Sequence, residues 1–235
     1  MVKSIMRLEQ VLPWGRSLKE YRDMFGLTQA ELDLQILDCA GGPASFNAEM
    51  TALGKRVVSC DPVYQFSAEQ IAQRIDEAVP QIVKSVEANR EKFVWTGIDT
   101  LDELLRIRLT AMQTFLADFP QGLQAGRYRQ DALPQLPFPD RAFDLVVSSH
   151  LLFTYSEHLS LDFHIAAITE MGRLAPDVRI FPLLMNMTGE RSPYVDPVIE
   201  HFQALGYTLQ IQTVPYEFQR GGNQILRLLS APAGN

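Results

Sequence analysis

A run of small residues follows the first apolar segment of the chain. The order is Asp38-Cys39-Ala40-Gly41-Gly42-Pro43-Ala44, and the residues that follow, as far as Met50, favour a helix. Small side chains let a backbone turn sharply between a strand and a helix, and they let a ligand approach it closely. Residues 36–50 therefore predict a strand–turn–helix unit that binds a ligand. A tight turn without a ligand is the alternative.

A second carboxylate strengthens this prediction. Asp61 follows the next apolar run, about twenty residues further on, where an acidic side chain can accept hydrogen bonds from both hydroxyls of a ribose. Each such charge-assisted bond contributes roughly 1.5–3 kcal/mol. The alternative for Asp61 is a turn-forming role before Pro62. Together, Asp61 and the small-residue turn predict a nucleoside site.

The turn also indicates which nucleoside cofactor fits. A dinucleotide needs backbone N–H groups and a helix N-terminus around its pyrophosphate, usually from a G-x-G-x-x-G segment. Here Ala40 and Ala44 stand at glycine-like positions, and Pro43 lacks an N–H. A cofactor without phosphates loses little by this, so the residues favour S-adenosylmethionine (SAM). An NAD-dependent Rossmann oxidoreductase and a SAM-binding protein without catalysis are the alternatives.

Composition excludes several other classes. The chain has 235 residues, a net charge of −7 and a pI near 5.1, and such acidity argues against nucleic acid as a partner. No apolar run is long enough to span a membrane, and residues 1–10 lack the apolar core of a signal peptide. Cys39 and Cys60 lack metal-binding spacing, so we expect free thiols, no metal site and a cytoplasmic location.

The elements that position these residues can be predicted from capping signals and apolar runs. Capping boxes at Ser17, Ser67 and Thr100 predict helix starts, and Thr28 starts a further helical turn. The expected helices cover residues 17–26, 67 onward with a kink or break at Pro80, 100 to about 118, and 192–206. The expected strands cover residues 34–39, 56–60, 127–130, 143–148, 178–184, 207–214 and 224–230.

The order of these elements predicts the fold class. Continuous apolar runs suit parallel strands covered on both faces, whereas the alternation in residues 207–214 suits an antiparallel edge. We expect one α/β domain over residues 1–235, with a doubly wound, mostly parallel seven-stranded sheet and an antiparallel C-terminal hairpin. Residues 1–33 add N-terminal helices. Residues 63–126 form a helical insertion after the second strand, which is either a decoration or a cap over the site.

Over nearly its whole length the sequence resembles class I SAM-dependent methyltransferases. Residues 38–44 resemble the first motif of that family, with Ala40 and Ala44 replacing glycines, and Asp61 resembles its ribose-binding acid. Residues 136–147 are similar to the segment that enters the fourth strand and are the most specific match. The resemblance implies SAM as cofactor, S-adenosylhomocysteine as product, and methyl transfer as activity. The expected cofactor-binding residues are Asp38, Ala40, Gly41, Gly42, Pro43, Asp61, Pro62, Asp131, Ala132 and Ser149, together with Arg16 as a candidate partner of the SAM carboxylate.

Three segments resemble an uncharacterised bacterial branch of the same family more closely. They are residues 15–21, 149–153 and 215–222. The last of them mixes aromatic, acidic and basic side chains, so it either closes the acceptor pocket or simply joins two strands.

The candidates for catalysis follow the fourth strand. His150 could act as a general base, because an ordinary histidine titrates near neutral pH. The alternative is a histidine that packs beneath the cofactor. Tyr155 is a weaker candidate. Methyl transfer needs mainly alignment of nucleophile and methyl group, so no base is obligatory. We expect a small neutral or cationic acceptor; the acceptor atom and the oligomeric state stay open.

Overall fold

A seven-stranded sheet forms the centre of the computed structural model, which describes residues 14–186 and 188–230. The strand order is β3-β2-β1-β4-β5-β7-β6. The first five strands are parallel, and β7 runs antiparallel to both β5 and β6. This confirms the predicted sheet and its antiparallel hairpin. The strands are β1 (Gln35–Cys39), β2 (Arg56–Cys60), β3 (Tyr128–Arg129), β4 (Leu145–Ser149), β5 (Asp177–Phe181), β6 (Thr208–Thr213) and β7 (Gln224–Leu229).

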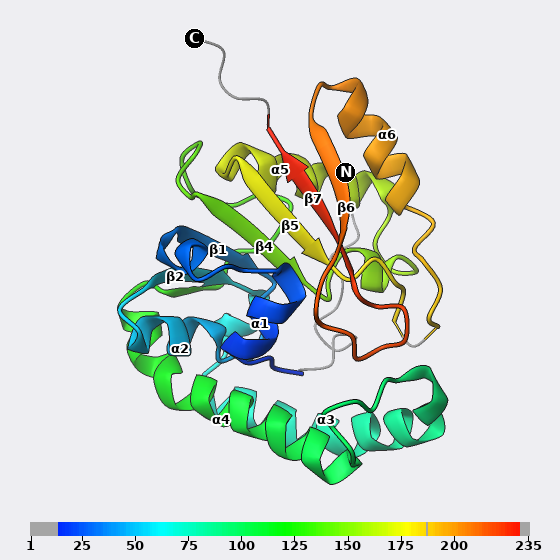
Figure 1. The fold of residues 1–235 in the computed structure, drawn as a ribbon. Coiled ribbons are helices and arrows are strands. Elements are labelled where there is room, and N and C mark those ends of the chain that lie inside the picture. The colour runs from blue at the N-terminus through cyan, green and yellow to red at the C-terminus, as the bar shows by residue number, and fades with distance from the viewer. Residues whose placement is uncertain (1–13, 187, 231–235) are drawn as a thin grey trace.

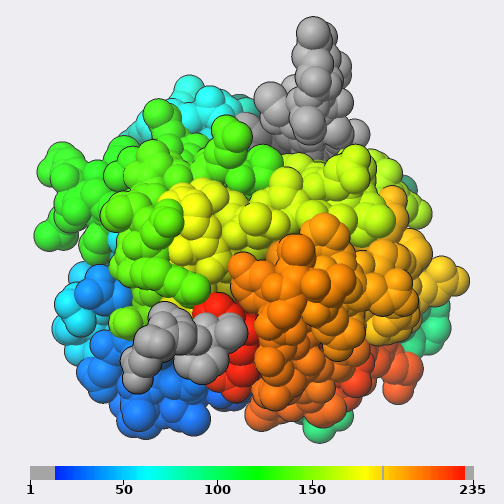
Figure 2. All heavy atoms as spheres, turned by 90° about the horizontal axis from the view of Figure 1, so that it is seen from above, coloured from blue at the N-terminus to red at the C-terminus, as the bar shows by residue number. Residues whose placement is uncertain are grey.

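Helices cover both faces of the sheet (Figure 1). Ile36 and Leu145 pack in a core with residues of α1 (Leu18–Phe25) and α2 (Phe46–Ala52). The next residues along these strands, Leu37 and Val146, pack in a core with residues of α5 (Leu161–Leu174) and α6 (Val195–Ala204). Successive side chains of a strand point to opposite faces, so unbroken apolar strands supply both cores. Figure 2 shows α5 and α6 side by side on the surface that is seen from above.

The insertion after β2 forms a helical layer beyond the carboxyl ends of the parallel strands (Figure 1). It consists of α3 (Ala68–Ala88) and α4 (Leu101–Gln124), with short 3-10 turns at η3 (Pro62–Gln65) and η4 (Arg90–Lys92). Aromatic rings anchor this layer to the sheet edge, since the Tyr64, Phe115 and Phe119 rings all pack around Tyr128 of β3. Two further 3-10 turns are η2 (Ala30–Asp33) and η5 (Phe153–Tyr155).

Several predicted boundaries were wrong. The helix that begins after Ser67 continues through Pro80 without the break that was one of the two alternatives there, and the other alternative, a kink, stays a prediction. Proline removes one helical hydrogen bond, but each side of it is anchored: Ile75 packs in the aromatic cluster of Phe115, and Ile82 in that of Phe93. The next helix continues past the expected end at 118 to Gln124 and includes Pro120.

Two other boundaries moved by a few residues. The last helix begins at Val195, not at Ser192, because the Ser192 hydroxyl accepts the Tyr194 N–H in a turn before the helix. Strand β5 ends at Phe181, since Pro182 has no N–H to donate to the sheet. The part of the predicted N-terminal helices that falls on residues 1–13 lies outside the described residues.

Candidate functional site

A cavity of about 950 Å³ lies at the carboxyl ends of β1, β2 and β4. In a doubly wound sheet, ligands bind in the crevice where the connections that follow two neighbouring strands lead to opposite faces of the sheet. Most of the predicted site residues meet here. Those that line the cavity are Arg16, Ala40, Gly41, Gly42, Pro43, Asp61, Pro62, Ala132, Ser149, His150 and Tyr155. Asp38 and Asp131 lie outside its lining.

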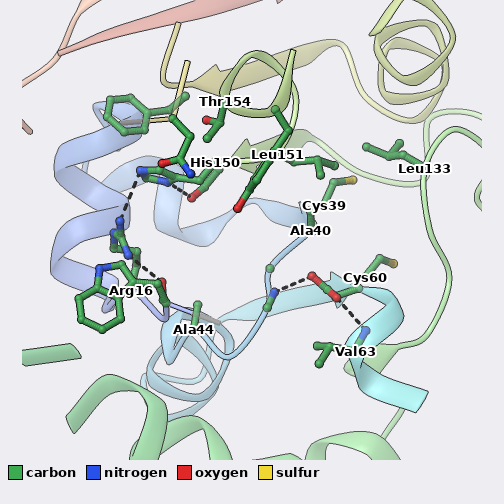
Figure 3. A pocket seen from close by; sticks show the side chains of 18 of the residues that line it. Arg16, Cys39, Ala40, Ala44, Cys60, Val63, Leu133, His150, Leu151 and Thr154 are labelled. Atoms are coloured by element: carbon green, nitrogen blue, oxygen red, sulfur yellow. Dashed lines mark hydrogen bonds between the residues drawn. The ribbon is translucent and has the colours of Figure 1, made fainter. Parts of the chain in front are cut away.

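The loop after β1 is held in a sharp turn. Ala40 and Gly42 both have positive φ, at 60° and 53°, and only Gly42 is of the type that adopts this without strain. The Ala40 N–H donates to the carbonyl of Cys60 at 2.8 Å, which ties the loop to β2. Figure 3 shows Ala40 and Ala44 between two groups of lining residues, with Arg16 and His150 on one side and Cys60 and Val63 on the other.

Asp61 points its carboxylate at this loop. Its Oδ2 accepts the Gly42 N–H at 3.0 Å, and its Oδ1 accepts the Val63 N–H at 2.8 Å (Figure 3). Burial raises the pKa of Asp61 to about 6, although the two backbone hydrogen bonds act in the opposite direction. A carboxylate oxygen has two lone-pair directions, so each oxygen can accept one further donor from the cavity.

Asp38 lies beneath the loop, at 1% exposure. Its Oδ1 accepts the Tyr21 hydroxyl at 3.1 Å, and its Oδ2 accepts the Ser59 hydroxyl at 3.0 Å. Burial raises its pKa to about 7, against the effect of both hydroxyl groups. A Cβ atom on Gly41 would come within 2.3 Å of Asp38 Oδ2, so glycine is required there to leave room for this carboxyl group.

Asp131 and Ala132, two of the expected cofactor-binding residues, differ in their position relative to the cavity. Asp131 forms an ion pair with Arg129 at 2.7 Å, whereas Ala132 lines the cavity. Leu133 and Pro134, which follow Ala132, line it as well. The apolar character of this wall suits a flat heteroaromatic ring.

Arg16 and His150 contact each other across the cavity wall. Arg16 is 7% exposed; its Nη1 donates to the carbonyl of Trp14 at 2.6 Å, and its Nη2 lies 3.4 Å from His150 Nε2 (Figure 3). The other ring nitrogen of His150 lies 2.8 Å from the Ser149 hydroxyl. Burial, with the charges of Arg16 and Arg108, lowers the pKa of His150 well below its ordinary value. The ring is therefore neutral near pH 7.

The arginine also determines the tautomer of this histidine. A guanidinium group only donates hydrogen bonds, so Nε2 of the neutral ring must be the acceptor that faces Arg16. The proton is then on Nδ1, which donates to the Ser149 hydroxyl. His150 adopts a positive φ of 53°, and its backbone N–H donates to the Phe181 carbonyl at 2.7 Å.

A buried ionic cluster behind Arg16 was missed by the sequence analysis. Arg108 of α4 donates to Glu20 Oε1 and, at 3.0 Å, to the Tyr216 hydroxyl. Burial acts to raise the pKa of Glu20, but the charges of Arg108 and Arg16 outweigh it and keep this carboxyl ionised. Arg108 is fully buried, and its Nε makes no hydrogen bond to any described residue.

The sequence contains a signal that could have identified Arg108. It lies on the apolar face of its helix, four residues after Leu104 and four before Met112, both of which are buried. A charged side chain on such a face needs a buried partner. Glu20 gave no comparable signal, because its part in the capping box with Ser17 explained it locally.

The insertion and the β6–β7 loop complete the cavity. Ile71, Arg74, Ile82 and Val86 of α3 contribute to its lining, as do Tyr216, Phe218 and Gln219 of the loop. The Val94 N–H donates to the Phe218 carbonyl at 2.7 Å, so the two segments are joined above the site. Side chains of α3 thus form part of the cavity wall, and the cap alternative for the insertion stays a prediction.

Two negative findings concern the described residues. No three His, Cys, Asp or Glu side chains in residues 14–186 and 188–230 are arranged to hold a metal ion. None of the helices in these same ranges has the length and apolar character that crossing a membrane requires.

His164 is buried on α5, with Nδ1 2.8 Å from the carbonyl of Ser160.

A curated protein of the archaeon Methanocaldococcus jannaschii, described as uncharacterized protein MJ0045, is 31% identical to the chain over 222 residues. These residues are 94% of this chain and 97% of the archaeal protein. The chain belongs to the family of MJ0045. No protein-family model matches the sequence. The family so defined includes an archaeal protein, and the predicted bacterial branch stays a prediction.

Solved structures that are similar to the chain have low sequence identity to it. A SAM-dependent methyltransferase of Aquifex aeolicus is 13% identical, with a TM-score of 0.41, over 90% of this chain and 87% of the other. The magnesium protoporphyrin IX methyltransferase of Synechocystis, solved with bound SAM, is 12% identical, with a TM-score of 0.42, over 91% and 90% of the two chains. The 1,6-didemethyltoxoflavin-N1-methyltransferase of Burkholderia thailandensis is 11% identical, with a TM-score of 0.44, over 91% and 79%.

Proposed function

We propose that the chain binds SAM and catalyses methyl transfer to a small-molecule acceptor. The observation that carries this proposal is the position of Asp61, whose buried carboxylate faces the small-residue loop at the carboxyl end of the sheet. Both carboxylate oxygens are held by backbone N–H groups and keep acceptor capacity toward the cavity. A ribose with two free hydroxyls is the ligand group that such a carboxylate recognises.

The remaining residues of the site fit the other parts of SAM. We assign the adenine to the apolar wall at Ala132 and Leu133, and the amino-acid end to the loop at Ala40–Gly42. Arg16 is the candidate partner of the SAM carboxylate, because it lines the cavity beside the small-residue loop and carries a positive charge. Asp38 supports the loop from below in this assignment and does not contact the ligand. Pro62 and Ser149 line the same cavity.

The start of α2 argues against a dinucleotide. Pyrophosphate sites use free N–H groups at the N-terminus of the helix that follows β1. Here Pro43 has none, and the Ser45 N–H donates to the carbonyl of Arg16 at 3.0 Å. A Cβ on Gly15 would lie 2.2 Å from the Pro43 carbonyl oxygen, so the N-terminal segment packs directly on the loop. The place of a pyrophosphate is thus covered by residues 15 and 16.

SAM supplies an activated methyl group on its sulfonium when bound. The contribution of the chain is to bind the acceptor and to align it with this group, which the rigid loop and the cavity walls can do. His150 was the candidate base, but its Nε2 faces Arg16 and its Nδ1 faces Ser149. We therefore assign His150 to holding Arg16 in place, as a positioning residue. Tyr155 lines the cavity and stays a candidate contact of the acceptor.

Isothermal titration calorimetry with S-adenosylhomocysteine tests the proposal. We expect binding with a dissociation constant below the millimolar range and no response to NADH in a fluorescence titration. Folded protein that binds NADH but not S-adenosylhomocysteine would contradict the proposal and support the oxidoreductase alternative. Binding without release of S-adenosylhomocysteine from SAM, across a broad acceptor panel, would favour the SAM-binding protein without catalysis.

A further inference from the structure

The part of the cavity next to Arg16 is apolar and is built from three separate segments. It is lined by side chains of the N-terminal segment, of the insertion and of the β6–β7 loop, which we call the apolar bay: Trp14, Ile82, Val86, Phe93, Tyr216 and Phe218. The Phe93 and Phe218 rings stack at 4.8 Å, which gives the bay a rigid floor. These segments lie far apart in the sequence, and the fold brings them together beside the proposed cofactor site.

Arg108, the positively charged side chain of the buried cluster with Glu20 and Tyr216, is adjacent to this bay. The guanidinium carbon of Arg108 lies 5.8 Å from the ring centre of Trp14 and 5.8 Å from that of Phe218. Tyr216 connects the two regions, because its ring lines the bay and its hydroxyl lies 3.0 Å from Arg108 Nη2 and 3.3 Å from Glu20 Oε1. A ligand in the bay would therefore be in the electric field of Arg108.

The charges of this region are not balanced. Arg16 and Arg108 carry two positive charges, and Glu20 is the acidic side chain that contacts them. The acidic side chains of the described lining, Asp61 and Asp162, belong to the end of β2 and the start of α5. SAM with an ionised carboxylate would bring its own negative charge, but also two positive ones, on its ammonium and sulfonium groups. An excess of positive charge thus stays next to the bay after the cofactor has bound.

We propose that the methyl acceptor is an organic anion with an apolar, ring-containing body. The apolar bay holds the body, and the field of Arg16 and Arg108 attracts the anionic group. Buried charges interact strongly across low-dielectric surroundings, so an amine in the same place would be disfavoured. This inference rests on the proposed function, and it differs from the sequence-based expectation of a neutral or cationic acceptor.

Three probes of similar size and different charge test the inference. They are 2-naphthylacetate, 2-naphthylacetamide and 2-(2-naphthyl)ethylamine, each titrated by calorimetry into the full chain with and without saturating S-adenosylhomocysteine. We expect the acid to bind at least about tenfold more tightly than the amide, and the amine to bind most weakly. Equal binding of acid and amide, preference for the amine, or no binding of any probe at millimolar concentration would overturn the inference.

Charge variants show whether the buried cluster sets this preference. Glu20→Gln keeps the capping box with Ser17 and removes one negative charge, so the ratio of acid to amide affinity should increase by about threefold or more. The double variant E20Q/R108Q also removes one positive charge, so the net charge of the cluster is that of the wild type. The ratio of acid to amide affinity should then return to the wild-type value or fall below it. Arg106→Gln, on the exposed side of the same helix, is the control and should leave the ratio unchanged. An unchanged ratio in folded E20Q would overturn the role of the cluster.

The two proposals fail in different ways. Protein that binds S-adenosylhomocysteine but does not distinguish the acid from the amide contradicts the acceptor inference alone. Protein that does not bind S-adenosylhomocysteine contradicts the proposed function, and the titrations without cofactor then decide whether the bay still prefers an anion. If E20Q does not fold, the wild-type ratio of the three probes decides the matter by itself.

Discussion

The backbone N–H of Gly42 donates a hydrogen bond of 3.0 Å to Oδ2 of Asp61, so that the loop after β1 and the end of β2 form one unit. This contact orients the Asp61 carboxylate toward the cavity and leaves its other lone pairs free for a ligand. Glycine at position 42 adopts its φ of 53° without the strain that a side chain would add.

Replacing Asp61 should weaken cofactor binding. Asp61→Asn keeps the size of the side chain but loses the charge that strengthens hydrogen bonds from ribose hydroxyls. We expect the affinity for S-adenosylhomocysteine to fall by at least about tenfold, or roughly 1.4 kcal/mol, as measured by calorimetry. Asp76→Asn, on the exposed surface of α3, is the matched control. Equal affinity of D61N and wild type would remove Asp61 from the site.

The affinity for S-adenosylhomocysteine should also depend on pH. The pKa of Asp61 is raised to about 6 in the free protein, and donors from a bound ribose favour the charged carboxylate. Affinity should therefore rise between pH 5 and pH 7, by up to about tenfold per pH unit below the pKa, and level off above it. Neither charged group of the amino-acid end titrates in this interval. The D61N variant should lose this dependence; if it keeps the wild-type slope, another group is responsible.

Asp38 should make the protein less stable as the pH rises from about 4 to about 7. Its pKa is raised to about 7 in the folded state, against about 3.9 for an ordinary aspartate, so the folded state binds a proton more tightly than the unfolded state. The contribution to the free energy of unfolding is complete below pH 4 and is lost between pH 4 and 7, on the order of 4 kcal/mol in all.

Urea denaturation of the wild type and Asp38→Asn at several pH values measures this contribution. An asparagine can still accept from Tyr21 and can donate to Ser59, so the variant should fold. The difference in unfolding free energy between the two proteins should change with pH across the interval from 4 to 7. A difference that is constant with pH would show that Asp38 does not titrate in this range.

A methyl group at Gly15 should lower the stability of the protein and weaken cofactor binding, although Gly15 does not line the cavity. The Cβ of Gly15→Ala would lie 2.2 Å from the Pro43 carbonyl oxygen and 2.7 Å from Met112 Cγ, so the N-terminal segment must move off the loop. We expect a lower melting temperature and weaker binding of S-adenosylhomocysteine, because Arg16 follows directly. Gly172→Ala is the control, as its Cβ would meet atoms no closer than 3.6 Å on a helix that favours alanine. If G15A melted and bound like G172A, the packing of this segment would not support the site.

Much of the fold and the cofactor side of the candidate site could be predicted from the sequence, because the signals there are local. The turn at Ala40–Pro43 and the position of Asp61 each follow directly from an apolar strand. Parallel strands bring their carboxyl ends to one edge of the sheet. The turn after the first strand and Asp61 after the second are therefore predicted to lie at the same site. The alternation of apolar and polar residues in 207–214 likewise predicted an antiparallel edge strand, and β6 pairs antiparallel with β7 at the edge of the sheet. The burial of β6 does not follow this alternation, because Ile211 is exposed.

The residues around the proposed acceptor part of the cavity could not be predicted from the sequence, because their contacts depend on tertiary structure. The contact between Arg16 and His150 joins residues 134 positions apart, and that between Glu20 and Tyr216 joins residues 196 positions apart. Such pairs form only when α1 and the residues before it are packed against the end of β4 and against the β6–β7 loop, and no local pattern encodes that packing. Packing also decided the protonation of His150, because burial and two neighbouring guanidinium groups keep its ring neutral. The sequence by itself determined the strand–turn–helix unit and its acidic partner, whereas only the tertiary structure decided which charges face the second half of the cavity.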